Sequence, residues 1–140
     1  MPTNTRDGST IYRFLAIAFG SISAVALVLT ALHIAPLLPH DNMTPAIAYG
    51  TSGAAAIGVL TAWLFFKPRV LRRRLGQSAE NYWASQDVAA SVQPVWLLLE
   101  AAATLAATGY LLTGSPFAAM VAAVAMVAFW SCRPQKLAQA

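Results

Sequence analysis

One acidic residue, Glu100, lies inside a strongly apolar stretch, and its type and position indicate chemistry. It follows Pro94 by six residues, which in a helix places it about 9 Å beyond that proline. A carboxylate at such a depth in a membrane costs about 2.5–3.5 kcal/mol unless it is protonated or paired. Arg13 and Thr61 are expected at a comparable depth on other helices. Three roles for Glu100 follow: a structural pair with Arg13, a proton- or ion-coupling acid, or a contact with a partner subunit.

The other reactive residues lack the spacing of a known site. His33, His40 and Asp41 are not placed together by any helical or hairpin spacing, so we expect no metal site. The single cysteine, Cys132, excludes an internal disulfide. The sequence contains no Ser/His/Asp set, phosphate-binding loop, dinucleotide fingerprint or metalloprotease motif. We therefore expect no cofactor and no enzyme activity, and an enzyme acting on lipid ranks last among the functions considered.

The composition is that of an integral membrane protein. The 140 residues are 58% hydrophobic and only 10% charged, with a mean hydropathy of +0.59. Soluble domains carry about 25% charged residues, so an ordinary soluble domain is excluded, as are a disordered chain and a disulfide scaffold. The net charge of +4 would suggest nucleic acid in a soluble protein. Here basic cytoplasmic loops explain it, and no nucleic-acid partner is expected.

Apolar stretches of helical length predict four membrane-crossing helices, at about 11–34, 45–66, 94–112 and 116–131. Spanning a hydrocarbon core of about 30 Å takes roughly 20 helical residues. The fourth stretch is shorter and would cross with little tilt or thin the bilayer locally. The predicted fold is an all-α, four-helix transmembrane bundle made of two consecutive hairpins, a single membrane domain over residues 1–140. The first helix is expected to be retained and not cleaved as a signal peptide.

Basic residues predict the orientation of this bundle. The loops at 36–44 and 113–115 contain no Lys or Arg. All nine bases fall on the other side of the four-pass arrangement: Arg6, Arg13, Lys67, Arg69, Arg72, Arg73, Arg74, Arg133 and Lys136. Positively charged loops face the cytoplasm. We therefore expect both termini and the basic segment 67–90 to be cytoplasmic.

A short interfacial helix is predicted before the third membrane helix. Ser78 can cap it, and Glu80 in its first turn suits the helix dipole. Tyr82 and Trp83 are interpreted as anchors at the headgroup level of the cytoplasmic leaflet, ahead of the entry at Pro94. An irregular loop carrying two anchoring aromatic residues is the alternative.

Small residues on the second helix predict close helix packing. They are Gly50, Gly53, Ala54 and Gly58, and the third helix offers Ala103, Ala106 and Ala107 in return. Small residues spaced by four let two membrane helices approach closely. Packing within the chain is the first interpretation of this stripe, and self-association is the second.

The second hairpin resembles a family of small uncharacterised four-helix integral membrane proteins of bacteria. The resemblance covers roughly residues 80–136 and is carried by Trp96-Leu-Leu-Leu-Glu100, Gly109-Tyr-Leu-Leu-Thr-Gly114 and Arg133-Pro134. It implies the same architecture, a bacterial inner-membrane location and a special place for Glu100, but no reaction. Helices two and three also resemble the hairpin of rotary-ATPase proteolipid subunits. They differ from it in having a long arginine-rich loop and an acid at a shallower depth.

Two functions follow as expectations. The first is a non-enzymatic accessory protein, a small subunit of a membrane complex, whose partners are the lipid bilayer and another membrane protein. The second is a small proton- or ion-coupled transporter that works as a homo-oligomer with Glu100 as its coupling acid. The chain is similar to small multidrug transporters in length and helix count, but those place their acid in the first helix, which has none here.

Overall fold

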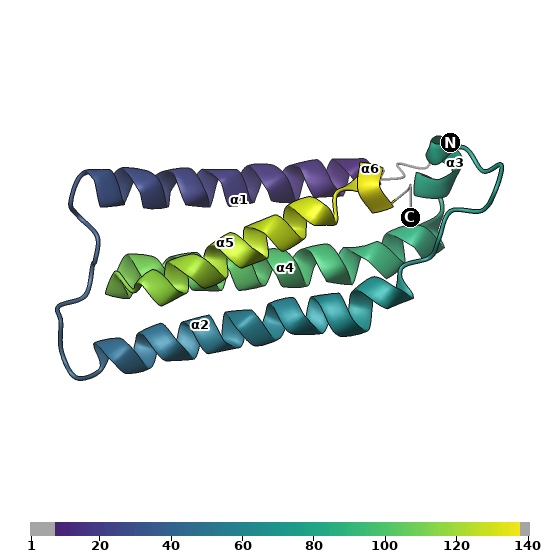
Figure 1. Cartoon of the computed structure of the whole chain (residues 1–140). Coiled ribbons are helices and arrows are strands. Elements are labelled where there is room, and N and C mark those ends of the chain that lie inside the picture. Colours follow the sequence, from purple (N-terminus) through teal and green to yellow (C-terminus); the bar gives the residue numbers. More distant parts are fainter. Residues whose placement is uncertain (1–7, 138–140) are drawn as a thin grey trace.

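The computed structural model describes residues 8–137, and over that range the chain forms helices and connecting turns with no strand. Arg6 lies outside the described residues. The long helices are α1 (Gly8–Ala31), α2 (Thr44–Thr61), α4 (Gln86–Thr113) and α5 (Pro116–Ser131). The short helices α3 (Ala79–Trp83) and α6 (Pro134–Leu137) lie at one end of the molecule (Figure 1). The prediction of an all-α chain is confirmed for the described residues.

Three helical segments are long and apolar enough to cross a membrane: Thr10–Ala31, Thr44–Arg69 and Gln86–Thr113. The helix expected over 116–131 is α5, which has those bounds. It is apolar but shorter than the three membrane-length segments. Helix α4 contacts α1, α2 and α5, and α2 also contacts α5. Consequently α4 is the most buried of the three long segments and α1 the least. The core therefore forms around α4, while much of the apolar surface of α1 faces outward.

Helix α4 begins at Gln86, eight residues before the predicted entry at Pro94, and Pro94 lies inside the helix. A proline in a helix interior removes one hydrogen bond and costs about 3 kcal/mol or more. The residues around it offset this cost, because Val88, Val92 and Val95 are all buried. The prediction that Pro94 starts the helix was wrong because burial of the preceding turns outweighs the local preference of proline.

The expected short helix exists as α3, but its aromatic residues pack on the protein core. The Ser78 hydroxyl accepts a hydrogen bond from the Asn81 N–H at 3.1 Å, so the predicted cap is formed. The helix ends at Trp83, and the chain enters α4 three residues later. Tyr82 and Trp83 are buried against the protein core. They therefore do not lie exposed as surface anchors, because the early start of α4 supplies a protein surface that covers them.

A chain of aromatic rings ties α1, α3, α4 and α5 together at the end where α3 lies. Tyr12 stacks on Phe129 with ring centres 4.7 Å apart and lies 5.1 Å from the ring of Trp96. The Trp96 ring in turn lies 6.0 Å from that of Trp83. The Trp96 indole N–H donates to the Cys132 carbonyl at 2.8 Å. Aromatic burial with a satisfied N–H therefore fixes the end of α5 against α4.

The first two helices end differently from the predicted 11–34 and 45–66. Helix α1 stops at Ala31, and His33 adopts a left-handed backbone conformation with φ of 56°. Helix α2 passes into a π-helical turn at Ala62–Phe66 and a 3₁₀ turn at Lys67–Arg69. Pro68, which lacks an N–H, lies within that last turn, so the helix tightens and then ends.

The connection between α1 and α2 closes the opposite end of the molecule. The N–H groups of Leu37 and Leu38 donate to the carbonyls of Leu111 and Leu112 at 2.9 and 3.0 Å. These carbonyls belong to the last turn of α4, where an α-helix leaves its acceptors free. Helix α4 then ends at Gly114, whose φ of 67° favours glycine. The loop therefore satisfies polar groups that an apolar environment would penalise.

Candidate functional site

Glu100 lies on the face of α4 that looks toward α1. Trp96, one turn before it, contacts Tyr12, and Ala103, three residues after it, packs in a cluster with Phe19. Glu100 itself is half-buried. Among the described residues, its Oε2 atom is buried and has no hydrogen-bond partner. A buried carboxyl oxygen without a partner is costly, so this atom is a candidate for holding a proton or meeting a cation.

The structure does not assemble the predicted set of Glu100, Arg13 and Thr61. Arg13 is exposed on α1, and within the described chain it supplies no donor to Oε2 of Glu100. The Thr61 hydroxyl donates to the carbonyl of Ile57, one turn back on its own helix, at 2.8 Å. A threonine in an apolar helix commonly makes this local bond. Among the described residues, no hydrogen bond therefore joins Oε2 of Glu100 to either of its expected partners.

The small-residue stripe of α2 is divided between two faces. Gly58 contacts α4, because a Cβ added there would lie 3.3 Å from the Cβ of Ala102. Gly50 and Ala54 are exposed. Apart from its chain neighbours and its own helix backbone, a Cβ built on Gly50 or Gly53 meets no described atom within 4 Å. Gly58 therefore packs within the described chain, whereas Gly50 and Ala54 lie on an open part of the helix surface.

The close approach of α2 and α4 occurs instead at Gly109. A Cβ added to Gly109 would overlap the hydroxyl of Thr51. The buried residues of α2 are Thr44, Ala48, Ser52 and Ala55, which lie on the face next to the predicted stripe. The spacing of small residues indicated close packing, but α2 carries so many small residues that spacing did not identify the face. Gly109 belongs to the Gly109-Tyr-Leu-Leu-Thr-Gly114 segment, for which no packing role was predicted.

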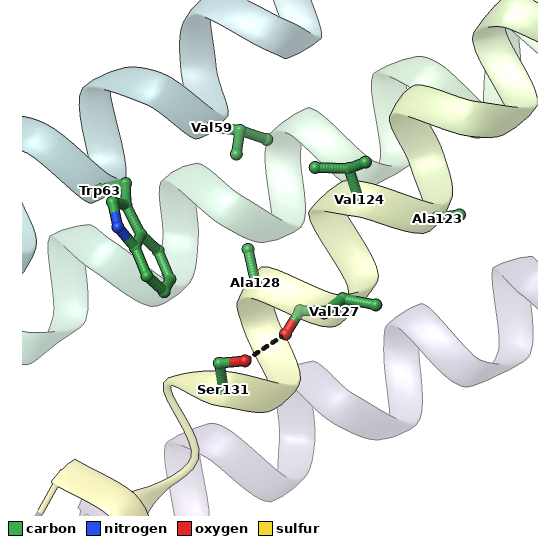
Figure 2. Close-up of a pocket in the computed structure, with 7 residues that line it drawn as sticks. All are labelled: Val59, Trp63, Ala123, Val124, Val127, Ala128 and Ser131. Atoms are coloured by element: carbon green, nitrogen blue, oxygen red, sulfur yellow. Dashed lines mark hydrogen bonds between the residues drawn. The ribbon is translucent and has the colours of Figure 1, made fainter.

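A groove that was not predicted from the sequence lies between α2 and α5. Its volume is about 420 Å³, and it is lined by Val59, Trp63, Ala123, Val124, Val127, Ala128 and Ser131. Figure 2 shows Val59 of α2 and Trp63 of the following π-helical turn across from the α5 side chains. The Ser131 hydroxyl donates to the Val127 carbonyl at 2.8 Å, so it is already bonded. The lining is thus almost entirely apolar.

A second hollow adjoins this groove at the end where the basic residues gather. It has a volume of about 330 Å³ and is lined by Trp63, Lys67, Pro68, Val70, Leu71, Arg72 and Leu137. The Lys67 ammonium lies 3.2 Å from the centre of the Trp63 ring. Such a cation–π contact holds the charge over the ring face. A tryptophan followed four residues later by lysine was the signal in the sequence that could have found this pair.

At the opposite end, Asp41 acts as a structural cap. Its carboxylate accepts hydrogen bonds from the Thr44 hydroxyl at 3.0 Å and from the N–H groups of Met43 and Thr44 at 2.9 and 3.0 Å. The hydroxyl bond, followed by the two backbone bonds, lowers the pKa of Asp41. His40 and Asp41 line a shallow hollow there. In residues 8–137 no group of three His, Cys, Asp or Glu side chains is placed to hold a metal ion.

Tyr82 shows the opposite pKa shift at the basic end. Its phenol donates to the Leu71 carbonyl at 2.7 Å. Burial raises the pKa of Tyr82 above its usual value. The residue thus fastens the arginine-rich connection to α3, which is a structural role.

Comparisons with protein-family models, with curated proteins and with solved structures find no match to this chain.

Proposed function

We propose that the chain is a four-pass integral protein of the bacterial inner membrane, built from two consecutive hairpins with both termini cytoplasmic. Three segments of sufficient length and apolarity support the crossings, and the packing of α5 against α2 and α4 supports a fourth. Figure 1 supports the orientation, because α3, α6 and the basic connection after α2 lie at one end and the loop 32–43 at the other. Clustered bases favour the cytoplasmic side.

Within that membrane, the proposed role is that of a non-enzymatic accessory subunit that binds another membrane protein. One observation carries this proposal: the open surface of α2 formed by Gly50, Gly53 and Ala54. In lipid, helices associate by close backbone packing at small residues, because lipid tails are as apolar as the side chains they would replace. An open small-residue face on a membrane helix is therefore suited to a second helix.

The experiment measures the native mass and composition of the gently solubilised full chain. A stoichiometric second protein is expected in the wild-type complex. Replacing Gly50→Leu or Ala54→Leu should remove it, because each added side chain prevents close helix approach. The matched control is Ala101→Leu, since Ala101 is also exposed but lies on α4.

A complex that survives both α2 substitutions would contradict the proposed contact. Equal loss in the Ala101→Leu variant would show a general effect of added bulk. A homo-oligomer in place of a second protein would overturn the accessory role and bring forward the second candidate function.

The second candidate is a homo-oligomeric, proton- or ion-coupled transporter that uses Glu100. The buried Oε2 atom of Glu100, which has no hydrogen-bond partner within residues 8–137, favours it. Glu100→Gln should then abolish proton-coupled flux in liposomes while the protein still folds, and Glu80→Gln, which alters an exposed acid, should not. The structural alternative predicts that Arg13→Ala destabilises the protein and that Glu100→Gln partly restores its stability.

A further inference from the structure

We propose that the groove between α2 and α5 and the adjoining basic hollow form one binding site for an anionic phospholipid. One acyl chain would occupy the groove, and the phosphate would lie beside Lys67 and Arg72. This inference rests on the proposed membrane location but not on the proposed partner contact, which uses Gly50 and Ala54 on another face of α2.

The groove has the chemistry of an acyl-chain site. It runs along α5 from Ala123 to Ser131, a distance of about 12 Å at 1.5 Å per residue. Its side chains are aliphatic or aromatic, and Ser131 is bonded to its own helix. A ligand part that fills it therefore gains apolar contact and finds no free polar group to satisfy. A hydrocarbon chain fits that requirement, whereas a polar solute does not.

Trp63 joins the groove to the basic hollow, because its side chain lines both. Val59, Trp63 and Lys67 follow one another at intervals of four residues, from the end of α2 through the two helical turns that follow it. The surface therefore changes from apolar to cationic along a single line. Figure 2 shows the Trp63 ring beside the groove. A ligand lying along this line must be apolar at one end and anionic at the other.

The charge at the cationic end supports a phosphate in that place. Lys67 and Arg72 line the hollow, and residues 67–74 carry five bases and no acid. The Lys67 ammonium is held over the Trp63 ring, beside the point where the groove begins. Basic pockets on the cytoplasmic side of membrane helices suit anionic headgroups. The occupant with both properties is an anionic phospholipid of the same leaflet.

The test compares retention of phosphatidylglycerol and of phosphatidylcholine with the same acyl chains, by native mass spectrometry of the full chain from mixed micelles. Wild type should retain phosphatidylglycerol preferentially. Lys67→Gln and Arg72→Gln should each weaken its apparent affinity about fivefold. Arg74→Gln is the matched control, because it removes the same charge from the same segment without lining the hollow.

A second pair of variants tests the acyl-chain part. Val127→Trp fills the groove from an exposed position. It should lower phosphatidylglycerol retention about as much as Lys67→Gln or Arg72→Gln does. Val25→Trp adds the same bulk at an exposed position on α1 and should leave retention unchanged. Both substituted positions are on the surface, so folding is expected to be preserved.

Equal weakening by Arg74→Gln would overturn the site, since it would show diffuse attraction to a charged segment. Unchanged retention in Val127→Trp would overturn the acyl-chain placement. If that variant instead removes a co-purifying protein, the groove binds protein and the lipid proposal fails. Resistance of the wild type to carbonate extraction tests membrane integration separately, so loss of the lipid site is distinguishable from failure of the proposed membrane location.

Discussion

At the scale of single residues, the indole of Trp96 makes a contact on which the packing of two helices depends. Its side chain is 1% exposed, and its N–H donates to the Cys132 carbonyl just beyond α5. Trp96→Phe keeps a ring but leaves that carbonyl without its donor. We expect the free energy of unfolding in detergent to fall by about 1–3 kcal/mol, the cost of an unsatisfied buried polar group.

Trp130→Phe is the control for this prediction. Trp130 is 62% exposed, and the guanidinium of Arg133 lies 5.5 Å from the centre of its ring. Its substitution should change stability by less than about 0.5 kcal/mol. Equal effects of the two substitutions would mean that neither the burial of Trp96 nor its hydrogen bond sets the loss of stability.

A second residue-scale prediction concerns Asp41 and acid pH. The pKa of Asp41 is lowered in the folded chain by the bonds to Thr44 and Met43. Because the pKa of Asp41 is lower in the folded chain than in the unfolded chain, where it is near 3.8, the cap contributes its full stability above about pH 3.8. That stability is lost as the pH falls through the pKa of the folded chain. Amide exchange in the first turn of α2 should therefore accelerate below about pH 3.8, beyond the intrinsic effect of pH.

Asp41→Asn is the control for that titration. The Asn side chain keeps an oxygen acceptor for the cap but cannot titrate. Relative to intrinsic rates, exchange at this turn should then be independent of pH over the acidic range. An unchanged acid-dependent opening in Asp41→Asn would assign the effect to another group.

At the scale of elements, the contact between α2 and α4 depends on the missing side chain of Gly109. A Cβ there would overlap the Thr51 hydroxyl, so Gly109→Ala should force the two helices apart. The expected loss of stability is about 1–3 kcal/mol, typical of an overpacked core. Thermal unfolding of the purified chain in detergent measures it, and adding Thr51→Ala should restore part of the loss.

Gly20→Ala is the matched substitution on α1. Apart from its chain neighbours and its own helix backbone, no described atom lies within 4 Å of a Cβ built on Gly20. Alanine favours the helix by roughly 0.5–1 kcal/mol over glycine, so stability should stay the same or rise slightly. A comparable loss at Gly20 would point to a general need for glycine in these helices.

At the scale of the whole molecule, the distribution of charge predicts how the chain lies in a membrane. The connection after α2 carries five bases within residues 67–74. It lies at the end of the molecule opposite the loop that holds Asp41 (Figure 1). With Cys132 replaced by alanine, Asp41→Cys should react with an impermeant maleimide in intact cells. Arg72→Cys should react only after permeabilisation. The reverse pattern would contradict the proposed orientation.

The sequence alone determined the features that follow from local chemistry. Apolar stretches of helical length predicted the long helices, and Ser78 predicted a cap that the structure forms. These features depend on nearest neighbours along the chain. Pro94 is a case in which local chemistry gave the wrong prediction. Its local preference is for the start of a helix, but burial of the residues before it keeps them helical, so α4 begins at Gln86.

Only the tertiary structure decided which side chains meet. Over the part of the chain that the structure describes, it left Oε2 of Glu100 without a hydrogen-bond partner. It also buried Tyr82 and Trp83 and divided the small residues of α2 between an inner and an open face. It also joined an apolar groove to a cationic hollow at Trp63. The physical reason is that apolar burial has no direction and many small residues pack equally well. The rotation of each helix is therefore set by the whole set of neighbours, which no spacing within one helix records.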